Sequence, residues 1–281
     1  DWMVNIIPAG VPFYPTDHCG VLRIKTEKIL PEYMMYALQA EGEYERFSRN
    51  NRASAQRIRS LVVQAPETKI QKNIIDELKA LDDKINGQNA EIEKYENSIR
   101  TKFDQIFHLE EFISDGVFSK YEGYSVEDLC IDGRGRVINQ QYIENHKGPY
   151  PVYSSQTTND GIFGSIDTFD FDGEYITWTT DGAKAGTVFY RNGKFNCTNV
   201  CGTLKAKNDK VNMRYLAYLL NRIAYKFVSR VGNNKLMNDA MKKIVVPVPK
   251  RQLQDEFADF VQSVEKSKFE CIGKKEKFEI E

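Results

Sequence analysis

The chain repeats part of its own sequence, and this repeat limits the possible fold more than any other feature. Residues 13–38 match residues 195–220 at a constant offset of 182. After one inserted residue, residues 62–71 match residues 245–254 at an offset of 183. The second stretch pairs Val62, Val63, Pro66 and Gln71 with Val245, Val246, Pro249 and Gln254. These identities in one order indicate two copies of the same structural unit.

Each copy predicts the same series of elements. A strand at residues 4–13 or 186–195 leads through a Thr-x-x-Cys-Gly turn into a short strand at 21–25 or 203–207. A helix at 31–39 or 213–222 follows, and then a polar loop at 48–52 or 229–235. An apolar strand at 58–63 or 244–248 ends at proline, and a long helix begins at Thr68 or Arg251.

Only the second copy includes a further β-rich stretch, residues 121–182. A complete copy therefore covers residues 121–249, a usual domain size, and the first copy is incomplete. We expect the chain to be a fragment of a longer protein rather than a natural truncation.

Residues 67–107 predict one long helix. Apolar side chains recur there in steps of three and four, the coiled-coil period, and the other faces are polar. The predicted packing residues are Ile74, Leu78, Leu81, Ile85, Ile92, Tyr95 and Ile99, with Ile106 continuing the row. The second copy is followed by a similar row, Phe257, Phe260, Val264, Cys271 and Phe278. Two such helices attached to the same type of domain predict an antiparallel coiled coil.

The predicted fold class is therefore α+β, with two β-rich domains alternating with two long helices. Residues 1–66 would form the C-terminal part of the first domain, and residues 67–112 the central helix. Residues 121–249 would form the second domain, and residues 250–281 the second long helix.

Motifs of catalysis are absent from the sequence. We find no phosphate-binding loop, no dinucleotide-binding glycine motif and no nucleophile elbow. Cys197 and Cys201 lack a second pair with zinc spacing, so we predict no metal site and no cofactor in this chain. Cys19 is expected to be a small buried residue because the repeat aligns it with Cys201. The chain is not expected to be an enzyme on its own.

Two further features point to a cytoplasmic protein. The five cysteines form no disulfide framework. The sequence also has no apolar run of 18 residues and no signal peptide.

Polar loops in the second domain suit DNA recognition. Asn and Gln match the adenine edge and Arg or Lys the guanine edge, while Ser, Thr and Lys also reach phosphates. Residues 121–250 contain seventeen Lys or Arg against thirteen Asp or Glu, whereas the whole chain has a net charge of −1. One such loop alone is more often an ordinary solvated turn. The loop residues are Ser154, Ser155, Gln156, Thr157, Thr158, Asn159, Thr180, Asp181, Lys184, Asn196, Thr198, Asn199, Arg230, Asn233, Asn234 and Lys235.

The whole arrangement resembles the specificity subunit of type I restriction–modification enzymes. The domain–helix–domain–helix order is the most specific part of this resemblance, which covers nearly the whole chain. The segments that carry it are Pro151-Val152-Tyr153-Ser154-Ser155, Tyr175-Ile176-Thr177-Trp178-Thr179-Thr180-Asp181-Gly182, Cys201-Gly202-Thr203-Leu204 and the helix entry from Pro247-Val248-Pro249 to Gln254.

The resemblance implies that each domain reads one half of a split target in double-stranded DNA and that the helices set the gap. It implies that the loops above face DNA, and that Thr16, Asp17, Arg49, Asn50, Asn51 and Arg52 occupy the matching places in the first domain. It also implies partners: modification (methyltransferase) subunits that methylate adenine, and a restriction (nuclease/translocase) subunit. S-adenosylmethionine, ATP and Mg²⁺ would belong to those partners.

Three other interpretations stay open at the level of sequence. The chain could be the recognition portion of a fused methyltransferase–nuclease, which methyltransferase motifs upstream in the same reading frame would support. It could be a coiled-coil adaptor that binds protein, with binding insensitive to salt. It could also be a nuclease with an unrecognised carboxylate site, which metal-dependent cleavage by the purified chain would reveal.

Overall fold

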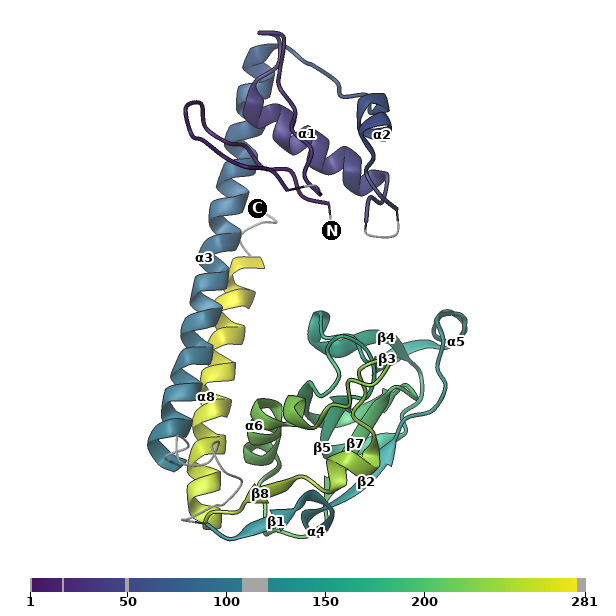
Figure 1. Ribbon diagram of the computed structural model, residues 1–281. Helices are drawn as coiled ribbons and strands as arrows, with labels where there is room; N and C mark the ends of the chain where they lie inside the picture. The colour runs from purple at the N-terminus through teal and green to yellow at the C-terminus, as the bar shows by residue number, and fades with distance from the viewer. Residues whose placement is uncertain (1, 17, 49–50, 108–120, 277–281) are drawn as a thin grey trace. The chain divides into compact units, whose positions relative to one another are not determined.

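A computed structural model describes residues 2–16, 18–48, 51–107 and 121–276, with side chains through Lys268 (Figure 1). The chain forms two compact units, Asp1–Glu93 and Lys94–Glu281. Helix α3 (Thr68–Phe107) continues from the first unit into the second. The predicted helix at 67–112 is therefore confirmed over residues 68–107, but its last turns belong to the second compact unit.

The first unit is built from helices. Helix α1 (Pro31–Tyr44) begins with proline at its first turn and runs five residues beyond the predicted end. Ser54 caps the short helix α2 (Ala55–Ser60) by accepting from Arg57 N. The Trp2 and Phe47 rings pack edge to face, with their centroids 5.1 Å apart, and the Trp2 indole N–H donates to Leu38 O at 3.1 Å. These contacts tie the start of the chain to α1.

The strands predicted at residues 4–13, 21–25 and 58–63 are wrong, because the described part of residues 1–66 contains no strand. The matching strands of the second copy pair with strands from residues 121–182, and the first copy has no counterpart of that stretch. The matching side chains are buried only where the strand is paired. Leu22 of the first copy is 60% exposed, whereas Leu204, its counterpart in the second copy, is fully buried. The β-rich character therefore lies in the second unit, while the α+β class with two long helices is confirmed.

A six-stranded sheet dominates the second unit, in the order β2-β7-β5-β6-β3-β4. All its neighbouring strands are antiparallel except β3 and β6. The strands are β2 (Cys130–Arg134), β3 (Lys147–Tyr153), β4 (Ile162–Ile166), β5 (Phe171–Thr179), β6 (Val188–Cys197) and β7 (Cys201–Ala206). A second sheet pairs β1 (Gly123–Ser125) with β8 (Val245–Pro247). The strands predicted at 186–195, 203–207 and 244–248 are thus confirmed within a few residues.

Short helices connect these strands, and α6 occupies the predicted helix position. The connecting helices are α4 (Val126–Leu129), α5 (Gln140–Asn145) and α7 (Asn238–Lys242), with 3-10 turns η2 (Asn159–Gly161) and η3 (Ala224–Phe227). Helix α6 (Met213–Ile223) lies between the sheet and α8 (Arg251–Glu276), as Figure 1 shows.

An aromatic cluster joins the end of α3 to α6 and α8. The Phe103 ring lies 4.8 Å from the Tyr218 ring and 4.9 Å from the Phe257 ring. Phe107 lies 4.9 Å from Tyr215. Phe103, Phe107 and Phe257 are fully buried. The core of this contact is therefore aromatic, and Phe103 and Phe107 were not in the predicted row.

The two long helices run antiparallel where both belong to the second unit. Lys102 pairs with Glu256 at 2.8 Å, and Glu96 pairs with Lys268 at 3.9 Å, so α3 and α8 advance in opposite directions. This confirms the predicted antiparallel packing for residues 94–107. Ile74, Leu78, Ile92, Tyr95, Ile99, Phe260 and Val264 are half-buried, and Leu81 and Ile85 are exposed. Phe278 and the side chain of Cys271 lie outside what the structure describes.

The repeat is also visible at the level of hydrogen bonds. Gln254 is buried and accepts from Asn212 N, while its amide donates to Lys210 O and Pro249 O. Gln71 in the first unit is equally buried and uses the matching partners, Leu30 N, Lys28 O and Pro66 O. In each copy one glutamine thus ties the start of a long helix to the segment before the shorter helix. Among the described residues, no helix is both long and apolar enough to cross a membrane.

Candidate DNA interface

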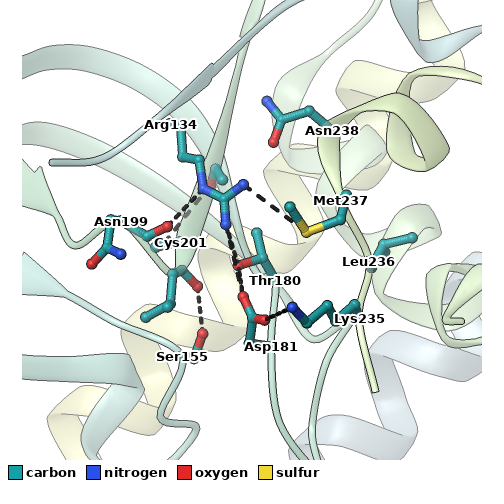
Figure 2. Close-up of polar contacts among 12 residues, drawn as sticks. Arg134, Ser155, Thr180, Asp181, Asn199, Cys201, Lys235, Leu236, Met237 and Asn238 are labelled. Atoms are coloured by element: carbon teal, nitrogen blue, oxygen red, sulfur yellow. Dashed lines mark hydrogen bonds and ion pairs between the residues drawn. The ribbon is translucent and has the colours of Figure 1, made fainter. Parts of the chain in front are cut away.

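Arg134 joins two of the predicted DNA-facing loops of the second unit and contacts the residue that follows a third. It lies at the end of β2, where its Nε donates to Asn199 O at 2.6 Å. Its Nη2 donates to Thr180 Oγ1 at 3.2 Å and lies 3.8 Å from an Asp181 carboxylate oxygen. Nη1 points at the Met237 sulfur, just beyond the third loop (Figure 2). One guanidinium therefore holds loops 179–184 and 196–199 together and contacts Met237, two residues beyond loop 229–235.

Loop 229–235 is a closed hairpin attached to its neighbour. Ser229 and Lys235 exchange both backbone hydrogen bonds, at 2.8 and 3.0 Å. Gly182 N donates to Asn234 O, and Leu236 N donates to Thr180 O. The buried Trp178 indole donates to Leu236 O at 2.9 Å. The hairpin and loop 179–184 thus form one continuous surface on a buried base.

Asp181 lies between two cations on this surface. Its carboxylate is 3.8 Å from Arg134 and 3.6 Å from Lys235. All three side chains keep about a third to a half of their surface exposed, so each pair stabilises the fold by at most about 1 kcal/mol. The weak pair with Asp181 leaves Lys235 available to a phosphate, whereas the nitrogens of Arg134 already contact the loops.

The loop between β3 and β4 is braced by its own side chains. Ser155 Oγ donates to Val200 O, and the Gln156 amide donates to Ile162 O. Thr198 Oγ1 lies 3.1 Å from Ser154 Oγ. These three predicted DNA-binding side chains of the loop therefore fix its shape, which leaves Thr158 and Asn159 exposed beyond them.

Arg191 holds the far end of the same loop from inside the domain. The residue is 4% exposed, and its guanidinium lies 3.6 Å from the centre of the Tyr153 ring. Nη1 donates to the Asp160 carboxylate at 2.5 Å, and Nη2 donates to Asp160 O at 2.6 Å. Nε donates to Thr177 Oγ1. Asp160 adopts a left-handed backbone (φ 50°), which L residues adopt rarely, and Arg191 anchors that turn.

The structure divides the predicted DNA-binding residues of the second unit by exposure. Thr180, Asn196 and Thr198 are buried, so their side chains have no surface for a base. Ser154, Ser155, Gln156, Thr157, Asp181 and Asn234 are half-buried. The exposed residues are Thr158, Asn159, Lys184, Asn199, Arg230, Asn233 and Lys235. These seven side chains are the ones free to face a ligand.

Among the described residues of the first unit, the predicted DNA-binding positions do not form a comparable surface. The Asn51 amide donates to Glu45 O and Arg46 O, and its oxygen accepts from Arg57 Nη1 at 2.6 Å, so Asn51 is structural. Thr16 is exposed and donates to Cys19 Sγ, and Arg52 is exposed. Asp17, Arg49 and Asn50 lie outside the described residues.

Comparison with known proteins identifies the fold family. The family model "Type I restriction modification DNA specificity domain" matches residues 4–94 and 119–281. The chain belongs to this specificity family. A Mycoplasma pneumoniae protein named as a type I specificity subunit is 39% identical over 75% of this chain and 77% of its own length. The specificity subunit of the type I restriction enzyme MpnII, from the same organism, is 48% identical over 52% of this chain and 44% of its own length.

Solved structures agree with this assignment at the level of the fold. The S subunit of the type I restriction–modification system of M. genitalium has a TM-score of 0.52 and 16% identity, over 89% of this chain and 70% of that one. The specificity family is a DNA-recognition family, and catalysis in type I enzymes belongs to the partner subunits. The family model and these relatives therefore confirm the predicted family and the predicted role as a DNA specificity subunit.

Sequence reasoning missed the two arginines that organise the specificity loops. Arg134 lies between two glycines, Gly133 and Gly135. The informative signal was the flanking Gly135, where a Cβ would lie 2.1 Å from Cys197 O, so the backbone there must approach the next loop closely. The sequence also contains a signal for Arg191. It lies on the same face of strand β6 as Phe189 and Phe195, where an apolar side chain would be expected.

The cysteines of the specificity domain are packing residues. Cys197 and Cys201 are buried beside Phe195 in an apolar cluster. The hydrogen bond with Cys201 and burial hold the Cys197 pKa well above its ordinary value, which disfavours the thiolate that a metal needs. Burial of Cys201 is confirmed, whereas Cys19 is exposed and its predicted burial is wrong. Among the described residues no cluster of His, Cys, Asp or Glu could hold a metal ion.

Proposed function

We propose that the second unit reads one half of a split DNA target through the surface that Arg134 assembles. The first unit would contribute the other half, and α3 with α8 would set the gap between them. The observation that carries this proposal is that three polar loops from distant parts of the sequence are joined. Arg134 contacts loops 179–184 and 196–199, and Gly182 N donates to Asn234 O of loop 229–235.

The chemistry of the exposed side chains fits base and phosphate contacts. Arg230 matches the guanine edge, and Asn159, Asn199 and Asn233 match the adenine edge. Lys184 and Lys235 supply charge for phosphates. Residues 121–250 carry the positive excess, with seventeen Lys or Arg against thirteen Asp or Glu.

Partner subunits would supply the chemistry that follows recognition. We infer that modification subunits methylate adenine with S-adenosylmethionine, and that a restriction subunit uses ATP and Mg²⁺. The paired helices α3 and α8 are the proposed docking surface for them. We propose genomic DNA as the target and the cytoplasm as the compartment in which the protein acts.

The experiment that tests the function maps methylated adenines in the source genome with and without this gene. A split motif that disappears on deletion supports the proposal. An unchanged methylation pattern contradicts it. A protein-binding adaptor would give the same negative result, and binding that does not weaken with salt would then favour the adaptor.

The loop assignment has its own test. Replacing Asn233, Asn234 and Lys235 by alanine should weaken specific DNA binding by tenfold or more, because one good base contact alone contributes about 1–3 kcal/mol. Helix content should stay unchanged, since the closing hydrogen bonds of the loop are backbone bonds. The measurement is DNA affinity of the complex with its modification subunits, at fixed salt.

A matched control lies at the opposite end of β7. Asn208 and Lys210 are exposed in the turn after that strand, whereas Asn199 precedes it. Asn208→Ala with Lys210→Ala removes one amide and one cation there and should leave affinity within a factor of two or so. Unaltered affinity in the loop 229–235 variant would remove that loop from the interface.

A further inference from the structure

The tip of loop 229–235 carries an apolar side chain without a folding role. Val231 is 91% exposed. The next residue, Gly232, has a left-handed backbone (φ 74°) and open space around its Cβ position, so nothing packs over the tip. A valine left in water contributes almost nothing to folding, because hydrophobic stabilisation scales with the apolar area removed from water.

The tip is nevertheless held on a rigid base. The two backbone bonds between Ser229 and Lys235 close the loop, and Leu236 directly after it is fully buried. Leu236 N donates to Thr180 O, and the Trp178 indole donates to Leu236 O. The loop therefore presents Val231 from a base with its backbone groups already paired, which lowers the entropy lost on binding.

The neighbours of Val231 indicate what kind of partner it meets. Residues 229–230 and 232–235 are polar, charged or glycine, with Arg230 directly before the valine and Asn233 two residues after it. Docking onto a protein usually requires a contiguous apolar patch, and within the loop Val231 stands alone. Val231 is a single apolar side chain between polar side chains. It would complement a partner surface that is polar and carries isolated methyl groups.

The major groove of DNA is such a surface. The C5 methyl of thymine is the apolar group on the base edges there, beside the acceptors of guanine and the donor–acceptor pair of adenine. The groove is wide enough for a two-stranded ribbon, and loop 229–235, closed by a single antiparallel bridge between Ser229 and Lys235, is no wider than such a ribbon. We propose that Val231 is a specificity residue that contacts the C5 methyl group of a thymine in the half-site of the second domain.

This inference rests on the proposed function, and its test separates the two. The test uses the full chain in complex with its modification subunits and duplexes that contain the mapped target. Each thymine of the half-site is replaced in turn by deoxyuridine, which lacks only the C5 methyl. We expect one position to weaken wild-type binding by about fourfold, the effect of one buried methyl-sized group.

Variants at the tip complete the test. Val231→Ala should bind the thymine duplex about fourfold or more weakly and should no longer distinguish thymine from uracil at that position. Val231→Ile should keep the distinction. Val245→Ala, in the second sheet, removes another exposed valine side chain and should leave the distinction intact. Equal melting temperatures for Val231→Ala and the wild type would show that folding is unaffected.

The outcomes differ for the two proposals. If the wild-type complex has no preference for the mapped target, the proposed function fails. If it binds the target specifically but no uracil substitution matters, or if Val231→Ala still distinguishes thymine from uracil, the Val231 contact is overturned. Weakening by Val231→Ala that is equal on thymine and uracil duplexes also overturns it, since a wedge between bases or a backbone contact would behave in that way.

Discussion

At the scale of single residues, arginines inside the second domain prepare the recognition loops. Burying a guanidinium is costly unless its donors are paired. Arg191 meets that condition with Thr177, with both the carboxylate and the carbonyl of Asp160, and with the face of Tyr153. Burial also raises the pKa of Tyr153, which keeps this ring neutral beside the arginine. The arrangement fixes a turn that would otherwise be strained.

The Arg191–Asp160 pair gives a testable coupling. Arg191→Lys keeps the charge but loses the planar fork and the stacking, so we expect a loss of about 1–3 kcal/mol of unfolding free energy. Asp160→Asn should cost less, since Asp160 is exposed. In the double variant the two losses should be non-additive, because both remove one contact. Urea unfolding of the wild type, the two single variants and the double variant measures the free energy of unfolding of each.

Hydrogen exchange separates a role in the loop from a role in general stability. In either single variant, amides of residues 156–161 should exchange faster while those of β7 keep their protection. Specific DNA affinity should also fall, because the loop would no longer be held in one conformation. Additive losses in the double variant, together with uniform exchange across the domain, would show that Arg191 serves the core and not the loop.

Residue types in the loops were predictable from sequence, but their burial was not. Asn196 and Thr198 follow the strand predicted at 186–195 in a polar segment, as DNA-facing residues would, yet both are buried and Asn196 donates to Thr168 O. Spacing along the chain does not say which side of a turn faces the sheet. Arg134 and Arg191 were missed for the same reason, since their partners come from distant segments.

At the scale of elements, helices were predicted better than strands. The starts of α3 and α8 were placed correctly because proline and apolar periodicity are local signals. The strands of the first copy were wrong because a strand needs partners, and its matching segment lacks them. The aromatic cluster of Phe103 with Tyr218 and Phe257 was missed, since it depends on α6 packing against both long helices.

The buried glutamines predict equal roles in both copies. Gln254→Ala leaves Asn212 N and the carbonyls of Lys210 and Pro249 without this partner, so we expect a loss of about 1–3 kcal/mol of unfolding free energy. Gln252→Ala, an exposed position on the same helix, should stay within about 0.5 kcal/mol. Urea unfolding followed by tryptophan fluorescence reports the change, because Trp178 is buried in the second unit.

Gln71→Ala extends this prediction to the first unit. The variant should loosen the contact between residues 28–30 and α3, and Trp2 reports from that unit. If Gln254→Ala and Gln252→Ala unfold at the same urea concentration, the buried amide does not stabilise the second unit. The glutamine hydrogen bonds that the two copies share would then not contribute to stability.

At the scale of the whole molecule, the central helix is the feature that connects the two units. Helix α3 has 40 residues, which at about 1.5 Å per residue gives a rod of about 60 Å. A compact domain does not need a helix of this length to cover its core. Its middle is polar, and Leu81 and Ile85 are exposed there. The length of the rod makes it suited to the proposed role of setting the gap between two half-sites.

Ile85→Pro tests that role. Proline in the interior of a helix removes a backbone hydrogen bond and costs about 3 kcal/mol or more, so the variant should kink or break α3. Ile85→Ala, at the same exposed position, keeps the helix and serves as the control. Affinity is measured on a series of duplexes whose two half-sites are separated by increasing numbers of base pairs. The wild type and Ile85→Ala should prefer one gap, and Ile85→Pro should lose that preference while each half-site is still recognised. If Ile85→Pro reads both half-sites at the same gap with the same preference, α3 does not set the spacing.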